Sequence, residues 1–148
     1  MVGGQVLDLI AEGKIENRGS GIGDRVEGLE AIHRMKTGEL IQSSLLLGNY
    51  AAREETRNWL HDYGTAFGLL FQVTDDLLDA EGSQQATGKM TGKDAAKGKL
   101  TYPGLLGIEA SREKAAELAQ TCVSAAERFG ERGRLLAELA RFVERRDR

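Results

Sequence analysis

The chain has a single proline, Pro103, in 148 residues, and few runs of β-branched residues. Proline breaks a helix interior because it lacks the amide hydrogen and its ring clashes with the preceding turn, so its scarcity permits long helices. The apolar residues recur at intervals of three and four, and we find neither a repeat nor an alternation of strand-like and helix-like segments. The sequence therefore predicts an all-α fold in one domain.

Helical periodicity indicates where the helices lie. Asp24 and Ser111 stand before periodic apolar segments and are residue types that cap helix N-termini. The predicted helices span residues 1–11, 25–48, 54–80, 111–129 and 133–146, with a short helical turn around Pro103 and loops over 12–24 and 81–99.

Glycines inside two of the predicted helices indicate local features. Gly38 disfavours helix by roughly 1 kcal/mol relative to alanine, so we expect a kink at Lys36–Gly38. Gly64 and Gly68 share one helix face because they are four residues apart. We expect them to allow either close packing of a neighbouring helix or room for a ligand.

Composition and charge exclude several classes of protein. The shares of hydrophobic residues, 41%, and charged residues, 29%, are typical of a globular chain and not of a disordered one. A net charge of −3 gives no global attraction to nucleic acid. No apolar run reaches the ~18 residues of a membrane span, and the first residues lack the basic segment of a signal peptide. The single cysteine, Cys122, fits a core position in a reducing compartment, so we expect a cytoplasmic protein.

Residues 71–79, "FQVTDDLLD", place acids among apolar neighbours, where a carboxylate is costly unless it is paired or bound to metal. On a helix Asp75 and Asp79 point the same way, and Asp76 is rotated by about 100° from Asp75. No lysine or arginine lies within a helical turn, so the cation is expected from solution or another segment. Magnesium fits because it commonly binds one or two carboxylates together with substrate phosphates. A solvated acidic helix end is the alternative.

Lysines follow the acids in a segment that contains glycine, where ammonium groups can close over a diphosphate. A solvated loop is again the alternative. A phosphate-binding P-loop is excluded because Gly88 and Gly92 enclose three residues instead of four, and Lys93 is followed by Asp94. The lysines of this segment are Lys89, Lys93, Lys97 and Lys99.

Four stretches follow one another along essentially the whole chain: "MVGGQVLDL", "IHRMKTGELI", "FQVTDDLLD" and "TGKMTGKDAAKGKLTYPGLLG". Their order and spacing are those of a known family. They resemble the C-terminal half of a trans-isoprenyl diphosphate synthase of the polyprenyl synthetase family, and in particular the bacterial farnesyl diphosphate synthase type. The resemblance implies half of an all-α isoprenoid synthase bundle around a deep prenyl pocket. It also implies head-to-tail condensation of an allylic diphosphate, dimethylallyl or geranyl, with isopentenyl diphosphate.

The resemblance assigns the acidic residues to a cluster of Mg²⁺ and diphosphate. "DDLLD" is similar to the family's second aspartate-rich motif, in which Asp75 would bind magnesium directly and Asp76 and Asp79 would hold its waters. Asp8, in the "GGQ…D" segment, would contact the same cluster.

The resemblance also assigns residues to the substrates. Gln5 would bind substrate beside Asp8, Lys36 would touch the allylic diphosphate, and Thr37 with Gln72 would face the developing carbocation. An apolar wall would keep water from this cation. The aromatic residues Tyr63, Phe67 and Phe71 either line that wall or pack in the core.

Part of the family pattern is absent from this sequence. Lys89 and Lys99 match diphosphate-contacting lysines of the family's closing loop, whereas Lys93 and Lys97 match nothing fixed. No second Asp-x-x-x-Asp cluster supplies the first aspartate-rich motif, and the arginine pair after it and the "GKR" contact to isopentenyl diphosphate are missing. We therefore expect a partial domain that is inactive alone and that self-associates or pairs with an N-terminal half.

Two other interpretations remain open. The chain can be a non-catalytic helical partner that binds diphosphate or regulates a full-length synthase, although Lys36, Asp75, Lys89 and Lys99 favour a catalytic role. Class I terpene cyclases also use aspartate-rich helices, but "KTG" and "GK…TYP" argue against that class.

Overall fold

The computed structural model describes residues 2–11, 26–50, 53–87 and 100–146, and the regular structure in these ranges is helical, without a strand. This confirms the all-α prediction. A π-helical segment, Arg34–Gly38, joins α2 to α3, and a 3-10 turn, Gly130–Gly133, joins α6 to α7. None of the helices in these ranges is both long and apolar enough to cross a membrane. The helices are α1 (Val2–Ala11), α2 (Val26–His33), α3 (Glu39–Gly48), α4 (Glu54–Thr87), α5 (Tyr102–Leu106), α6 (Ile108–Glu127) and α7 (Arg134–Arg145).

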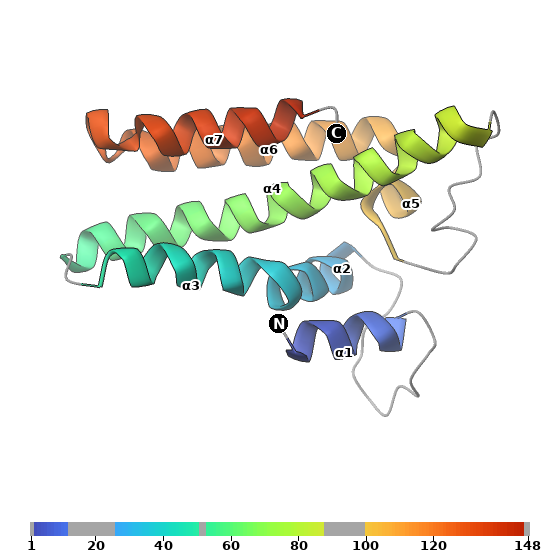
Figure 1. Cartoon of the computed structure of the whole chain (residues 1–148), viewed down its shortest axis with the longest axis horizontal. Coiled ribbons are helices and arrows are strands. Elements are labelled where there is room, and N and C mark those ends of the chain that lie inside the picture. The colour runs from blue at the N-terminus through green and yellow to red at the C-terminus, as the bar shows by residue number, and fades with distance from the viewer. Residues whose placement is uncertain (1, 12–25, 51–52, 88–99, 147–148) are drawn as a thin grey trace.

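The long helix α4 is the central element (Figure 1). α6 and α7 pack along one side of it and α3 along the other, and α5 packs near its C-terminal part. α1 contacts the π-helical segment and α2. α4, which carries the acidic motif, therefore lies between two layers of helices.

The core forms where α4, α6 and α7 meet. Leu70 and Val73 of α4 are fully buried, as are Cys122 and Ala126 of α6 and Ala140 of α7. The small alanine side chains allow the helix backbones to approach one another closely. Burial raises the pKa of the Cys122 thiol to about 12, so this cysteine is an unreactive core residue, as the sequence predicts.

Tyr63 belongs to this core and not to an open wall. Its side chain is 1% exposed, and its ring stacks on Phe67 with the centroids 5.4 Å apart. Its hydroxyl donates a hydrogen bond to the Leu136 carbonyl oxygen at 2.9 Å, which links α4 to α7. Burial raises the pKa of Tyr63, so the hydroxyl remains a neutral donor.

Glycines let the π-helical segment approach both α4 and α1. A Cβ on Gly68 would lie 2.7 Å from the Gly38 Cα, and a Cβ on Gly4 would lie 2.2 Å from the Lys36 backbone nitrogen. Of the two expectations for Gly68, close packing is the one observed. The kink expected at Lys36–Gly38 takes the form of the π-helical segment.

Replacing Gly68 by alanine is expected to destabilise the chain by about 1–3 kcal/mol, because the added methyl group meets backbone that cannot rotate away. Chemical unfolding measures the loss. Gly82→Ala in the same helix is the control, since a Cβ there meets nothing within 4 Å, and it should stabilise the helix by up to about 1 kcal/mol. Equal stabilities of the two variants would contradict the close approach of α4 to the π-helical segment.

The predicted end of α4 is wrong. α4 continues to Thr87, whereas the sequence predicts a loop from residue 81. No proline follows Gly82 before the end of the helix, and each residue added to an existing helix gains a hydrogen bond. The glycine alone therefore does not terminate the helix.

The predicted start of the next long helix is also wrong. α6 begins at Ile108, with Gly107 at the N-cap and a φ of 85°. The Ser111 hydroxyl lies inside the first turn and donates to the Gly107 carbonyl oxygen at 2.7 Å, so Ser111 is not the cap. The cap that the sequence did not indicate is Thr101, whose Oγ1 accepts a hydrogen bond from the Gly104 N–H at 3.2 Å at the start of α5. Asp24, the other predicted cap, lies outside the described residues.

Candidate functional site

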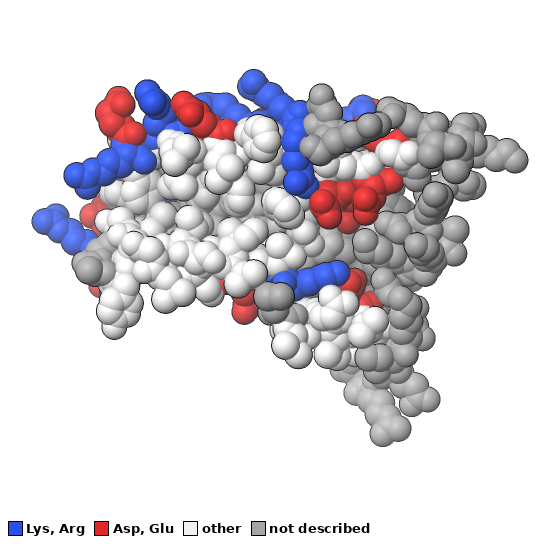
Figure 2. Space-filling model, in the orientation of Figure 1, with Lys and Arg blue, Asp and Glu red and all other residues white. Residues whose placement is uncertain are grey.

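The acidic motif on α4 divides into exposed and buried carboxylates. Asp75 and Asp79 are exposed, with 55% of the Asp75 side chain accessible, whereas Asp76 is only 7% exposed. The turn of about 100° between successive helical residues separates them, as the sequence predicts. Figure 2 shows acidic atoms gathered in a compact patch over the C-terminal half of α4.

A cation reaches the motif from the end of α7. Arg146 donates a hydrogen bond from Nη2 to the Asp75 Oδ1 at 3.1 Å. Its guanidinium carbon lies 4.5 Å from the centre of the Phe71 ring, and 17% of its side chain is exposed. The expectation of a cation from another segment is thus met by a residue 71 positions away in the sequence.

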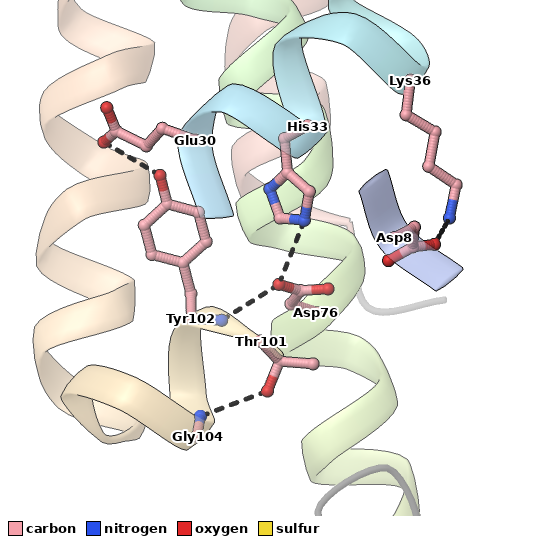
Figure 3. A network of polar contacts seen from close by, with 8 residues as sticks. All are labelled: Asp8, Glu30, His33, Lys36, Asp76, Thr101, Tyr102 and Gly104. Carbon is pink, nitrogen blue, oxygen red and sulfur yellow. Dashed lines mark hydrogen bonds and ion pairs between the residues drawn. The ribbon is translucent and has the colours of Figure 1, made fainter. Parts of the chain in front are cut away.

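Asp76 lies at a junction of helices and is held there by polar contacts (Figure 3). Its Oδ2 accepts a hydrogen bond from the Tyr102 backbone N–H at 3.0 Å and lies 3.8 Å from the His33 Nε2. The Tyr102 hydroxyl donates to the Glu30 Oε1 at 3.0 Å, and this oxygen lies 3.9 Å from the Lys114 Nζ. The network connects α4 with α2, α5 and α6.

The burial of this network explains why Asp76 is anchored. Tyr102 is fully buried. Burial is the largest cause that raises the pKa of the Tyr102 hydroxyl, and the charge and hydrogen bond of Glu30 raise it further, so the hydroxyl stays a neutral donor. The Tyr102 N–H is also buried, and a buried donor without an acceptor is costly. Asp76 supplies that acceptor at the first residue of α5.

Asp8 and Lys36, which the resemblance assigns to one cluster, form an ion pair (Figure 3). The Lys36 Nζ donates to the Asp8 Oδ2, and 12% of the Asp8 side chain and 32% of the Lys36 side chain are exposed. The pair joins α1 to the π-helical segment, at the point where Gly4 permits close approach of the two backbones.

The other predicted site residues have different environments. Thr37 and Gln72 are half-buried, and Gln5 is exposed on α1. Lys89 and Lys99, which the resemblance assigns to diphosphate, lie outside the described residues, as do Lys93 and Lys97.

Several residues of the site were not predicted. His33 and Tyr102 lie inside the quoted motifs "IHRMKTGELI" and "TYPGLLG", so the sequence contained a signal for them. Glu30 and Arg146 carry no local signal, because their contacts join segments that are distant in the chain.

The oxygens of the acidic motif fit one side of a magnesium site. Asp75 and Asp79 are exposed carboxylates one helical turn apart, and Asp75 already contacts a positive charge. Among the residues that the structure describes, no group of three or more His, Cys, Asp or Glu side chains is placed to hold a metal ion. An ion at Asp75 would therefore complete its coordination with water, substrate phosphate or another protein segment.

Two surface grooves run along α4, and the aspartates of the acidic motif line neither of them. One of about 290 Å³ lies between α3 and α4, and one of about 650 Å³ lies between α4 and α6. His61, Thr65 and Leu69 line both grooves. Neither contains a predicted site residue, so neither is assigned to substrate.

Comparison with known proteins gives a consistent result. The model of the family described as polyprenyl synthetase matches residues 1–138. The chain is 45% identical over 121 residues to farnesyl diphosphate synthase of Escherichia coli (strain K12), covering 80% of this chain and 38% of that protein. It is 39% identical over 150 residues to a chloroplastic geranylgeranyl pyrophosphate synthase of Catharanthus roseus, covering 99% of this chain and 40% of that protein.

A solved structure agrees with the sequence relatives. The geranyltransferase from Helicobacter pylori, complexed with magnesium and isoprenyl diphosphate, is similar with a TM-score of 0.70 and 31% sequence identity, over 97% of this chain and 45% of that one. The chain spans about two fifths of the length of the two curated relatives.

Proposed function

Because the chain belongs to the polyprenyl synthetase family, we propose that it forms the C-terminal part of a prenyltransferase of isoprenoid biosynthesis. The reaction joins an allylic diphosphate, dimethylallyl or geranyl, to isopentenyl diphosphate, as in a farnesyl diphosphate synthase. The observation that supports this most strongly is the division of the acidic motif. Asp76 anchors α4 from within, and Asp75 and Asp79 present exposed carboxylates.

The acidic residues would hold magnesium and diphosphate. Asp75 would bind Mg²⁺ directly, Asp76 and Asp79 would hold water of its hydration shell, and Asp8 would contact the same cluster. Mg²⁺ held by these residues would stabilise the negative charge that develops on the departing diphosphate. Anchoring by Tyr102 keeps the Asp76 carboxylate, and with it this part of α4, in one orientation.

The substrate contacts come from α1, the π-helical segment and the lysine-containing segment. Gln5, Lys36, Lys89 and Lys99 bind the diphosphate groups, where ammonium and amide donors match phosphate oxygens. Thr37 and Gln72 face the allylic carbons with their oxygen atoms and stabilise positive charge there.

The chemistry consists of one bond broken, one formed and one proton transferred. The allylic C–O bond breaks, and diphosphate leaves with the electron pair. The double bond of isopentenyl diphosphate then attacks the allylic cation and forms the new C–C bond. Loss of a proton to the departed diphosphate restores a double bond. Apolar side chains exclude water, which would otherwise capture the cation.

The chain supplies one carboxylate arm of this site, and the first aspartate-rich motif would come from an N-terminal half of the domain. Large apolar side chains are exposed in the described part of the chain, and such surface favours association. An N-terminal half of the domain would cover this surface and supply the motif, whereas a second copy of the chain would cover the surface only. The most exposed of these side chains are Val2, Leu47, Tyr50, Leu135 and Phe142.

The purified chain is expected to give no measurable turnover of geranyl diphosphate with isopentenyl diphosphate, because it lacks the first aspartate-rich motif. Mixing it with the N-terminal part of the Escherichia coli relative, ending where the match begins, should restore product formation. Diphosphate release and chromatography of the labelled prenyl product measure the reaction. The N-terminal part alone is the control.

Two outcomes would contradict parts of this proposal. Robust turnover by the chain alone would refute the requirement for a second arm. Binding of diphosphate without any product, in a mixture shown by sizing chromatography to form a complex, would instead support a non-catalytic helical partner.

A further inference from the structure

The contact between Arg146 and Asp75 joins the C-terminal end of α7 to the acidic motif of α4. The Arg146 Nη2 donates to the Asp75 Oδ1 at 3.1 Å, and its guanidinium lies over the Phe71 ring at 4.5 Å. Only 17% of the Arg146 side chain is exposed, compared with 55% of the Asp75 side chain. The arginine is therefore held against α4 by ring stacking as well as by charge.

The contact between Arg146 and Asp75 leaves one buried donor of the arginine without a hydrogen bond to the described residues. The Arg146 Nε is buried and makes no hydrogen bond within the described part of the chain. A buried donor without an acceptor disfavours the state that contains it, and an ion pair with a largely exposed carboxylate contributes little stability. The guanidinium can therefore leave Asp75 at small cost.

We propose that Arg146 is an internal counter-ion of Asp75 that competes with divalent metal for this carboxylate. The inference rests on the proposed function in one respect, the assignment of Asp75 as a metal ligand. Two positive charges in contact with one carboxylate repel each other, so Mg²⁺ binding displaces the guanidinium from Oδ1.

Titration calorimetry of the full chain with MgCl₂ alone, at constant ionic strength, tests the competition. Arg146→Gln is expected to tighten Mg²⁺ binding about fivefold, the size expected when one solvent-screened cation is removed from contact with the carboxylate. Arg145→Gln is the matched control, because it makes the same change of charge at the neighbouring, exposed position. It should alter the affinity by less than about twofold.

Two further variants separate this inference from the metal assignment. Arg146→Lys keeps the positive charge and should stay within about twofold of the wild type, while Asp75→Asn should weaken binding strongly. If Arg146→Gln and the wild type bind Mg²⁺ equally and Asp75→Asn binds weakly, the competition is overturned and the metal assignment stands. If neither the wild type nor any variant binds Mg²⁺, or if Asp75→Asn binds Mg²⁺ with the affinity of the wild type, the metal assignment fails and the competition with it.

Discussion

Replacing Asp75 by asparagine is expected to lower the kcat/KM of the enzyme assembled from this chain and an N-terminal half by roughly 10³-fold, or about 4 kcal/mol of transition-state stabilisation. The carboxylate proposed to bind metal directly would lose its charge. The free energy of unfolding should change by less than about 1 kcal/mol, because an exposed ion pair such as that with Arg146 contributes little. Steady-state kinetics and chemical unfolding of the same preparation measure the two effects.

Asp62→Asn is a closely matched control for Asp75→Asn. Asp62 lies on the same helix, 55% of its side chain is exposed, and its carboxylate pairs with Arg128 at 3.0 Å. The change therefore removes the same charge and the same kind of ion pair away from the acidic motif. A similar loss of activity in both variants would show that Asp75 acts through general charge or stability and not at the site.

Replacing Asp76 by alanine is expected to cause a clear loss of stability, unlike the replacement of Asp75. The buried Tyr102 N–H loses its acceptor, which costs about 1–3 kcal/mol. For a chain of this size such a loss lowers the melting temperature by roughly 3–10 °C. Thermal unfolding followed by circular dichroism measures the shift.

Two variants sharpen the test at Asp76. Asp76→Asn keeps an oxygen acceptor and should recover part of the stability lost in Asp76→Ala. Thr74→Val is the control, because Thr74 is 4% exposed and its hydroxyl makes no hydrogen bond within the described residues, so the change should leave stability unchanged or raised. Unchanged stability of Asp76→Ala would show that Asp76 does not anchor α5.

The helices could be predicted because local sequence determines most of them. The spacing of apolar residues and the positions of glycine and proline predicted the helix that ends at Ala11, the kink at Lys36–Gly38 and the helical turn around Pro103. The errors at Thr87 and Ile108 arose where local signals compete. A single glycine in a long helix is tolerated, and a serine side chain can bond back to the preceding turn instead of capping.

The site could be predicted only where its contacts are local or carried by a motif. The helical period separated Asp76 from Asp75, and the structure shows that one is buried and the other exposed. The resemblance, and not spacing, assigned Asp8 to the metal–diphosphate cluster and Lys36 to the allylic diphosphate, and the ion pair between them was not predicted. The contacts of Asp76 with Tyr102 and of Asp75 with Arg146 join distant segments, and their geometry depends on how the helices pack.

The most direct test of the central claim is a crystal of the two-part assembly soaked with Mn²⁺ and a bisphosphonate, followed by measurement of anomalous scattering at the manganese edge. If the chain supplies one carboxylate arm of a prenyltransferase site, an anomalous peak should lie at bonding distance from the Asp75 carboxylate, between it and the bisphosphonate oxygens. Peaks that lie elsewhere, with Asp75 still bound to Arg146, would contradict the assignment.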